Sequence, residues 1–215
     1  YVEAIPYKGY YVARVEELYR LDRAVAGIRE KELDRGKGYT VDFSPHGIDM
    51  GAFPFGIWRK LTKNALSQDK KEMFALGEPK GDLRLRETIA RYLHASRGVN
   101  CTPRQIIVGA GNDFLLLLLR HILGERCCVA FENPTYPRAF QIFEMFSRRL
   151  ATVPSDEGGL RVEALDAVGA QAVYVMPSHQ YPKGVAMPIG RRLELLHWAS
   201  QGIGRYVIED DYDSE

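Results

Sequence analysis

The feature that most constrains the fold is an alternation, from about the middle of the chain onward, of short apolar runs with helical segments. Runs that are apolar throughout are typical of strands buried on both faces of a mainly parallel sheet. The predicted strands comprise residues 105–108, 127–131, 172–176 and 206–208. Because helices separate these strands, the sequence predicts an α/β fold in which helices cover both faces of a mainly parallel sheet.

Helical segments fill the spaces between these runs. Asp82 is a suitable N-cap, and Gly98 a suitable stop, for a helix between them. Further helices are predicted over residues 57–70, 113–123 and 191–200, and from the loop at Pro137 toward Arg149.

The first 40 residues have a different texture. Two short β-like runs within residues 1–13 flank the turn Pro6-Tyr7-Lys8-Gly9, which predicts a hairpin. Residues 14–40 are charged and weakly periodic, and we interpret them as a linker with one helical stretch over residues 16–34. The α/β pattern then occupies residues 41–215.

Composition excludes several classes of function for this segment. A net charge of +1 gives no electrostatic reason to expect that it binds nucleic acid or a membrane surface. The apolar run at residues 114–119 is far too short to span a bilayer. Three cysteines, two of them adjacent in an apolar run, indicate reduced core thiols in a cytosolic protein.

Four loops follow the predicted strands at their carboxyl ends, where parallel sheets bind ligands. They comprise residues 109–112, 133–136, 177–184 and 210–212. Each contains residue types that can contact a ligand, so we expect the functional site at this edge of the sheet.

The first two loops allow an anion and a planar ring. Gly109-Ala110-Gly111-Asn112 leads into a helix, whose N-terminal N–H groups favour an anion. The alternative is an ordinary strand-to-helix turn, since the sequence matches no phosphate-loop signature. Tyr136 can stack on a planar ligand or simply pack over the sheet edge.

The third loop offers hydrogen-bond donors. His179 and Gln180 can donate to a ring oxygen, although a histidine beside a turn is often only a solvated residue. Lys183 is a candidate nucleophile, but nothing near it in the sequence lowers its pKa, and a Pro-Lys-Gly turn more often exposes its lysine.

The last loop is acidic. Asp210 can face a ring nitrogen and keep it protonated, with Tyr212 beside it. A metal site is the alternative for Glu209, Asp210, Asp211 and Asp213, but neighbours along a strand alternate faces, which disfavours a shared ion.

Taken in order, these loops resemble the fold-type I pyridoxal-phosphate enzymes of the aminotransferase class I/II family. The chain is more similar still to the aminotransferase-like domain of MocR-type regulators of the GntR superfamily, which follows a winged helix-turn-helix and a linker. The similar stretches are Gly9–Ala13 (end of the wing), Asp42–Pro45, Gly77–Gly81, Ser178–Pro182 and Glu209–Glu215.

The resemblance implies a role for each site residue. Ala110, Gly111 and Asn112 match the turn that holds the phosphate of pyridoxal 5'-phosphate, and Tyr136 matches the aromatic residue that stacks on its ring. Asp210 matches the carboxylate that pairs with the pyridine nitrogen. Tyr212 matches a residue that bonds the ring hydroxyl, and His179 or Gln180 matches a further contact to a ring oxygen.

Two departures from the family pattern stand out. Leu76 replaces a tyrosine that reaches a cofactor phosphate across the dimer. No lysine between Lys8 and Lys183 has the Ser-x-x-Lys setting of the Schiff-base lysine. We therefore expect this lysine, and the arginine that binds the substrate carboxylate, beyond Glu215, and no catalysis by residues 1–215 alone.

The leading hypothesis is an effector-sensing domain of a cytoplasmic, homodimeric regulator. An amino acid or amine effector would act on it through pyridoxal phosphate, and an upstream winged helix would bind DNA. The alternative is an aminotransferase that moves an amino group between an amino acid and a keto acid. A third possibility is a segment that only folds and dimerises.

Overall fold

The computed structural model of the chain describes residues 2–12, 49–66, 74–146 and 149–212. The chain divides into two compact units, residues 1–71 and 72–215. The predicted linker over residues 14–40, including its helical stretch, lies outside the described residues.

The first unit begins with a hairpin. Strands β1 (Val2–Ile5) and β2 (Gly9–Val12) pair antiparallel, with Ile5 opposite Gly9. Lys8 N donates to Ile5 O at 3.0 Å and closes the turn, in which Tyr7 and Gly9 both have a positive φ. The hairpin predicted within residues 1–13 is confirmed, and its interpretation as part of a wing remains a prediction.

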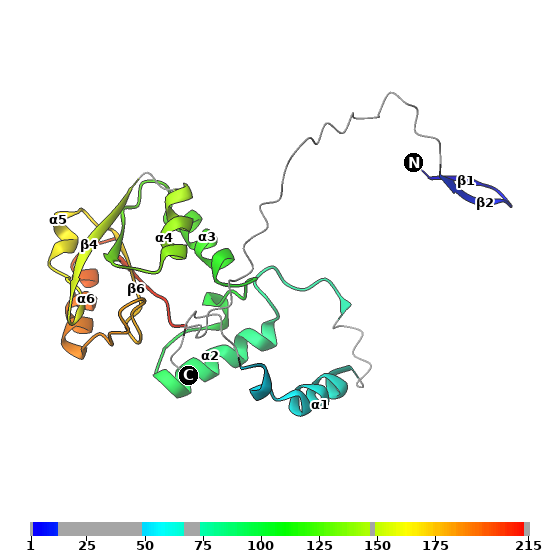
Figure 1. The fold of residues 1–215 in the computed structure, drawn as a ribbon, viewed down its shortest axis with the longest axis horizontal. Coiled ribbons are helices and arrows are strands. Elements are labelled where there is room, and N and C mark those ends of the chain that lie inside the picture. The colour runs from blue at the N-terminus through cyan, green and yellow to red at the C-terminus, as the bar shows by residue number, and fades with distance from the viewer. Residues whose placement is uncertain (1, 13–48, 67–73, 147–148, 213–215) are drawn as a thin grey trace, which may run out of the picture. The chain divides into compact units, whose positions relative to one another are not determined.

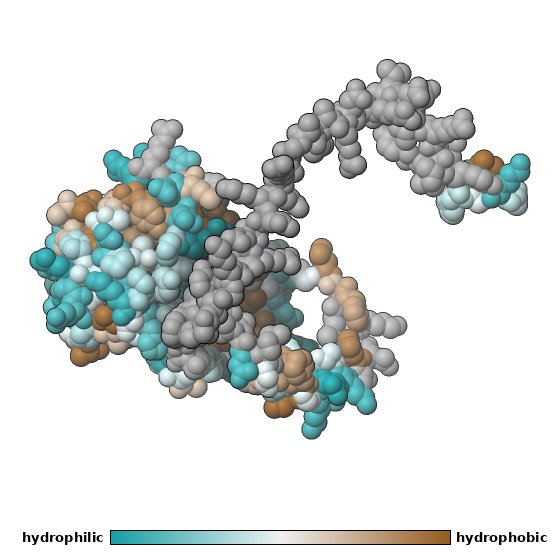
Figure 2. All heavy atoms as spheres, in the orientation of Figure 1, coloured by the Kyte–Doolittle hydropathy of each residue, from teal (hydrophilic) through white to brown (hydrophobic). Residues whose placement is uncertain are grey.

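The same unit contains a short 3-10 turn η2 (Met50–Ala52) and an amphipathic helix α1 (Phe55–Leu66). The helix begins two residues before the predicted range 57–70, whose last four residues are outside the described part. Every side chain of α1 is exposed within the chain, and Figure 2 shows brown and tan spheres among teal ones along this helix.

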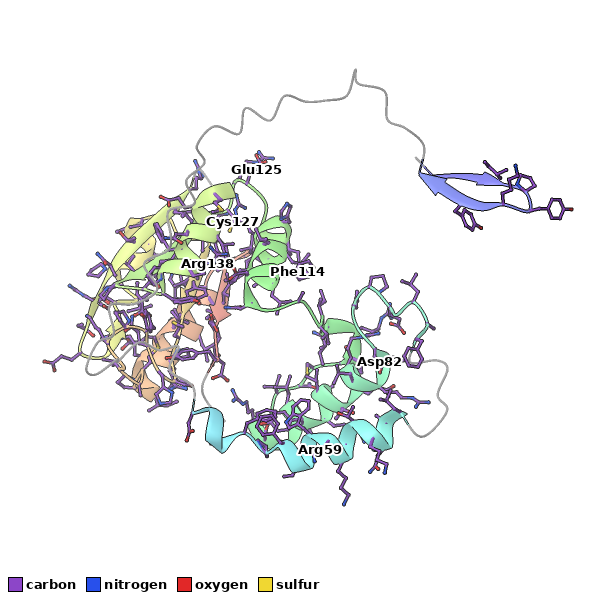
Figure 3. The ribbon with its side chains drawn as sticks, turned by 45° about the vertical axis from the view of Figure 1, so that its right-hand side comes forward. Arg59, Asp82, Phe114, Glu125, Cys127 and Arg138 are labelled. Atoms are coloured by element: carbon purple, nitrogen blue, oxygen red, sulfur yellow. The ribbon has the colours of Figure 1, made fainter. Side chains whose placement is uncertain are left out.

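Helix α2 (Leu83–Arg97) opens the second unit and has the predicted ends. Asp82 Oδ1 accepts a hydrogen bond from Leu85 N at 3.0 Å (Asp82 is labelled in Figure 3). Gly98 takes the left-handed conformation, with φ 66°, and terminates the helix. Both caps were visible in the sequence because capping depends on local residue types.

The prediction of a strand over residues 105–108 is wrong. A 3-10 turn η4 (Pro103–Gln105) precedes an irregular segment, in which Val108 N donates to Lys80 O at 2.9 Å. The buried Arg86 of α2 donates to Gly81 O and Pro103 O, each at 2.9 Å, and so ties this segment to the helix. An apolar run by itself does not create the neighbouring strand that a ladder requires.

The described strands of the second unit form a five-stranded sheet in the order β5-β4-β3-β6-β7. They are β3 (Val129–Asn133), β4 (Leu150–Asp156), β5 (Gly159–Leu160), β6 (Ala172–Val175) and β7 (Tyr206–Glu209). Strand β3 pairs parallel with β4 and β6, and β6 pairs parallel with β7. Among the described strands of this sheet, β5 alone pairs antiparallel, with β4. The predicted mainly parallel sheet is confirmed, whereas β4 and β5 were not predicted.

Helices cover both faces of this sheet, as expected (Figure 1). Helices α3 (Asn112–Leu123) and α4 (Pro137–Phe146) lie on one face, and α5 (Ala164–Ala167) and α6 (Ile189–Ser200) lie on the other. Alternate residues of the central strand serve the two cores. Phe131 packs with the α3–α4 side, whereas Ala130 packs with the α5–α6 side.

The cysteines are free thiols. Cys127 is buried and Cys128 half-buried, just before β3, and burial raises the pKa of both above the ordinary value. A raised pKa keeps a thiol protonated and unreactive, consistent with a packing role. Among the described residues, no helix is both long and apolar enough to cross a bilayer.

Candidate functional site

Parallel pairing brings three of the four predicted loops to one edge of the sheet. Strands β3, β6 and β7 are adjacent and run in the same direction, so the segments that follow them emerge together. The turn before α3 joins them through side-chain contacts. The candidate site therefore comprises the loops at residues 109–112, 133–136, 177–184 and 210–212.

Asp210 links two of these loops. Its Oδ2 accepts a hydrogen bond from Asn112 Nδ2 at 3.1 Å and another from the hydroxyl of Tyr174. Its own backbone N donates to Val175 O at 2.9 Å, which fixes it as the continuation of β7 beside β6. The residue expected to meet a ring nitrogen and a residue of the expected phosphate turn thus lie in direct contact.

Tyr174 is a site residue that sequence reasoning missed. Its side chain is fully buried in β6, and Phe131 lies beside it with 5.1 Å between ring centroids. Burial, together with the hydrogen bond to Asp210, raises the pKa of Tyr174 above its ordinary value. The hydroxyl therefore remains a neutral donor to Asp210. A lone polar residue in an otherwise apolar strand was the available signal.

The turn before α3 suits an anion. Gly111 is the N-cap of the helix with φ 90°, a conformation that favours glycine. A Cβ on Gly109 would come within 2.7 Å of Leu115 Cδ2, whereas one on Gly111 would meet open space. Ala110, Gly111 and Asn112 are exposed at the N-terminus of a 12-residue helix, whose dipole attracts negative charge.

Tyr136 is half-buried beside a second tyrosine. Its ring meets that of Tyr181 edge-on, with 5.7 Å between centroids. Both rings pack against the core cluster that contains Tyr174. Tyr181 was not predicted as a site residue, although it directly follows Gln180. Arg138, labelled in Figure 3, binds Asp113 with Nε 2.8 Å from Oδ2 and so connects the start of α4 to that of α3.

His179 and Gln180 are placed differently. Gln180 is buried, and its carboxamide bonds to backbone groups of Pro134 and Lys183. His179 is exposed, and its carbonyl accepts a hydrogen bond from the Tyr212 hydroxyl at 3.1 Å. The contact between His179 and Tyr212 joins the third loop to the fourth.

Lys183 is exposed and engaged with β4. Its Nζ lies 3.0 Å from Ser155 Oγ and 3.5 Å from Ser155 O. These contacts give the amine the setting of a surface lysine that braces a turn. They provide none of the desolvation that activates a nucleophilic lysine.

Neighbouring acids of the last loop point to different partners. Asp210 bonds with Asn112 and Tyr174, whereas Asp211 forms an ion pair with Arg97 at the end of α2. In the part of the chain that the structure describes, no three His, Cys, Asp or Glu side chains are grouped to hold a metal ion. Asp210 therefore belongs to the candidate functional site, whereas Asp211 belongs to a structural ion pair.

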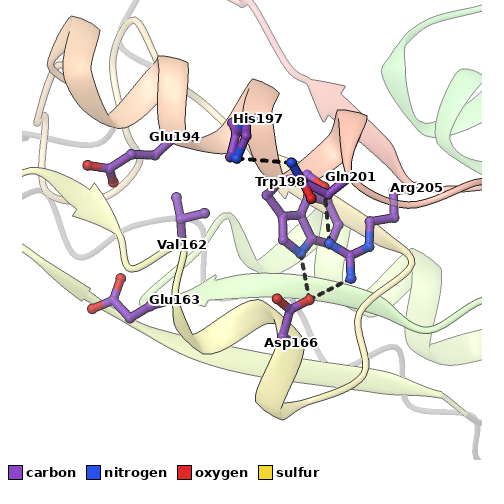
Figure 4. Close-up of a pocket in the computed structure, with 8 residues that line it drawn as sticks. All are labelled: Val162, Glu163, Asp166, Glu194, His197, Trp198, Gln201 and Arg205. Carbon is purple, nitrogen blue, oxygen red and sulfur yellow. Dashed lines mark hydrogen bonds and ion pairs between the residues drawn. The ribbon is translucent and has the colours of Figure 1, made fainter.

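A separate surface pocket of about 720 Å³ lies between α5 and α6, at the amino ends of β6 and β7 (Figure 4). Asp166 Oδ1 accepts hydrogen bonds there from Trp198 Nε1 at 3.1 Å and from Arg205 at 2.7 Å. The Arg205 guanidinium also lies 4.8 Å from the centroid of the Trp198 ring. This acid is thus neutralised by a cation, and its cluster ties two helices together.

Residues 48–201 match the family described as aminotransferase class I and II, and the chain belongs to this family. The HTH-type transcriptional regulator YdeL of Bacillus subtilis is 36% identical over 216 residues, which cover 100% of this chain and 46% of YdeL. The "Probable rhizopine catabolism regulatory protein MocR" of Rhizobium meliloti is 32% identical over 85% of this chain and 37% of its own length. The resemblance to MocR-type regulators is thus confirmed.

Solved structures agree on the fold. The crystal structure of Pyrococcus horikoshii kynurenine aminotransferase matches with a TM-score of 0.65 and 29% identity, over 74% of this chain and 41% of that one. The chain spans about half the length, or less, of the curated relatives it matches. What it shares with both groups is part of the large aminotransferase domain.

Proposed function

We propose that this chain supplies the non-covalent part of a pyridoxal-phosphate site in the effector-sensing domain of a MocR-type regulator. The observation that carries the proposal is the contact of Asp210 with Asn112 and Tyr174. It joins a carboxylate, suited to a pyridine nitrogen, to a helix N-terminus suited to a phosphate.

The residues present fit this cofactor. The exposed turn Ala110-Gly111-Asn112 is proposed to hold the phosphate, and the half-buried Tyr136 is proposed to stack on the ring. Asp210 is proposed to pair with the ring nitrogen and keep it protonated. When bound, pyridoxal phosphate supplies an electron sink for chemistry at an amino compound.

The oxygen substituent of the ring is proposed to meet the third and fourth loops. Tyr212 is the first candidate because its side chain is exposed beside the third loop; its hydroxyl, which donates to the His179 carbonyl, would exchange that bond for the ring oxygen. Of the two neighbouring candidates, His179 has an exposed side chain. Gln180 is buried, and its carboxamide is hydrogen-bonded to the backbone. We therefore favour Tyr212 and His179 for direct contact.

The regulatory role is supported by what the relatives are. YdeL and MocR are named as regulators, and both match most or all of this chain. We propose a cytoplasmic homodimer in which an amino acid or amine acts through the cofactor and DNA is bound by a winged helix outside residues 1–215. The ligand biases the dimer only as far as it binds two of its states differently.

Aminotransferase activity is the second candidate, and the match to a kynurenine aminotransferase favours it. Within the described residues, Lys183 is bonded to Ser155 and lacks the desolvated setting of a reactive lysine. Multiple turnovers of the full-length protein with amino donors and keto acids would support the enzyme. A single half-reaction, or none, would support the sensor.

The cofactor proposal is tested by spectroscopic titration of the 215-residue chain with pyridoxal phosphate. We expect saturable, reversible binding that dialysis removes. Binding that survives dialysis, with a covalently modified lysine found by mass spectrometry after borohydride reduction, would contradict the assignment of the anchoring lysine to a position outside this chain. A flat titration would contradict the cofactor proposal itself.

A further inference from the structure

Two buried polar side chains belong to strand β3, which leads into the loop that bears Tyr136, and to the loop that bears His179. Glu132 is the fourth residue of β3 and is 2% exposed, and Gln180 is 4% exposed. Buried polar groups cost free energy unless they are hydrogen-bonded, so their placement needs a reason. Gln180 has its carboxamide engaged with the backbone, so Tyr212 and His179 are favoured over it for direct contact with the cofactor.

Gln180 bonds to both loops at once. Its Nε2 donates to Pro134 O at 2.7 Å, in the loop that leads to Tyr136. Its Oε1 accepts a hydrogen bond from Lys183 N at 3.0 Å and so closes the turn that follows Gln180. The backbone bond from Gly184 N to Gln180 O, at 2.6 Å, closes the same turn. One carboxamide therefore fixes the spacing between the segment after β3 and the segment after β6.

Glu132 completes this arrangement from the strand side. Its carboxyl interacts with the Gln180 side chain, while its Oε2 is buried with no hydrogen-bond partner among the described residues. Lys183 and Tyr174 are the titratable groups whose charges interact with it. Burial raises the pKa of Glu132 to about 7, although Gln180 and Lys183 lower it. A carboxyl with a pKa near neutrality is only partly ionised at that pH, which lowers the cost of burying it beside the carboxamide.

The Tyr136 ring depends on the same two loops. Its edge-on neighbour, Tyr181, directly follows Gln180. A shift of the third loop relative to the second would therefore separate the two rings. Small displacements of groups that hold a ligand weaken binding strongly, because the bound geometry is no longer formed in advance.

We propose that Glu132 and Gln180 form a buried pair of positioning residues that holds the Tyr136 loop and the His179 loop in register for the cofactor ring. The proposal rests on the proposed function for its ligand, since the ring is that of pyridoxal phosphate. The pair acts through Tyr136 and Tyr181 without touching the cofactor.

The test compares Gln180→Ala and Glu132→Gln with Trp198→Phe as the matched control. Trp198 is equally buried but belongs to the cluster at the opposite end of the strands. We expect Gln180→Ala to bind pyridoxal phosphate about tenfold more weakly, because it loses the hydrogen bonds to Pro134 and Lys183 and the order that they impose. Glu132→Gln keeps an acceptor for Gln180, so binding within about twofold of the original chain supports the hydrogen-bonded pair, and a loss as large as that in Gln180→Ala would overturn it. Trp198→Phe should also stay within about twofold of the original chain.

The spectrum of the bound cofactor separates positioning from simple destabilisation. At saturating pyridoxal phosphate, the induced circular dichroism should be weaker in Gln180→Ala and unchanged in Trp198→Phe. Equal affinity and equal dichroism in Gln180→Ala and Trp198→Phe would overturn the proposal.

Hydrogen exchange tests the pair without the ligand. Gln180→Ala should raise exchange in both segments 133–137 and 178–184, whereas Trp198→Phe should leave both unchanged. Faster exchange confined to residues 178–184 would overturn the proposal. If the original chain fails to bind pyridoxal phosphate, the proposed function is wrong, and this exchange pattern still decides whether the pair couples the loops.

Discussion

Asp210 and Asp166 each accept a hydrogen bond from a buried aromatic side chain, at opposite ends of the same strands. Asp166 bonds Trp198 and also Arg205, whose positive charge balances its own (Figure 4). Asp210 bonds Tyr174 and Asn112, so its hydrogen-bond donors among the described residues are both neutral. The two carboxylates therefore have similar anchors but different electrostatic balance.

The difference suggests how this fold separates stability from binding. A carboxylate paired with a guanidinium has its charge satisfied inside the protein and has little left to offer a ligand. A carboxylate held by neutral donors is fixed in direction yet keeps its charge for a cationic partner, such as a protonated ring nitrogen. The cluster of Asp166, Trp198 and Arg205, at the amino ends of the strands, is thus expected to contribute to folding. The cluster of Asp210, Tyr174 and Asn112, at the carboxyl ends, is expected to contribute to ligand binding.

The largest expected effect concerns Glu132, whose burial near the carboxyl ends of the strands lowers the stability of the folded chain when its carboxyl is ionised. Its pKa is about 7 in the folded chain against an ordinary 4.5, so the folded state holds the proton more tightly. The carboxyl is protonated in both states below pH 4.5, and the unfolded chain ionises first as pH rises. The free energy of unfolding should therefore fall by about 3 kcal/mol from this group between pH 4.5 and 7.

Glu132→Gln should remove that pH-dependent loss, because it keeps the shape and has no proton to release. Denaturant unfolding of both proteins at pH 4.5 and pH 8 measures the change. A loss of stability with rising pH that is the same in both would show that Glu132 is not the group responsible.

Trp198→Phe should lower the free energy of unfolding by about 1–2 kcal/mol, because it removes the bond to Asp166 and part of a buried ring. The affinity of the folded chain for pyridoxal phosphate should not change. A parallel loss of affinity would mean that the two ends of the sheet are coupled, so that stability and ligand binding are not separated between them.

Tyr136→Ala should weaken pyridoxal phosphate binding about tenfold, because the stacking surface is lost. Tyr136→Phe keeps the ring and serves as the control, with affinity close to that of the original chain. Fluorescence titration compares the three proteins. Equal binding by Tyr136→Ala would assign the ring contact to another residue, with Tyr181 the next to test.

Asn112→Ala is expected to have the smallest effect. It removes a neutral hydrogen bond to Asp210 but leaves the backbone N–H groups of the turn in place, so affinity should fall about fivefold. Stability should change little, since Asn112 is exposed. A far larger loss would show that the side chain binds the phosphate directly.

Local signals let the sequence predict much of this fold. Asp82 and Gly98 marked the ends of α2 because caps are read from neighbouring residues. The apolar runs before residues 132 and 177 marked β3 and β6, and the rule for parallel sheets then located the loops that Asp210 and Asn112 join.

Features that depend on pairing were out of reach. Residues 150–160 have no continuous apolar run, so β4 and β5 were missed, and an apolar run at 105–108 found no partner strand. The role of Tyr174 follows from the register that sets Val175 beside Glu209 and so brings Asp210 to its hydroxyl. Sequence alone does not specify that register.

The most direct test of the central claim is the dissociation constant of pyridoxal phosphate for Asp210→Asn and Asp166→Asn, measured by spectroscopic titration beside the original chain. Asparagine keeps the size of each side chain and removes its charge. We expect Asp210→Asn to lose ten- to hundredfold in affinity, the worth of a hydrogen bond to a charged group, while Asp166→Asn binds as the original chain does. Equal affinity in all three proteins, or equal losses in both variants, would contradict the claim that Asp210 keeps its charge for the cofactor.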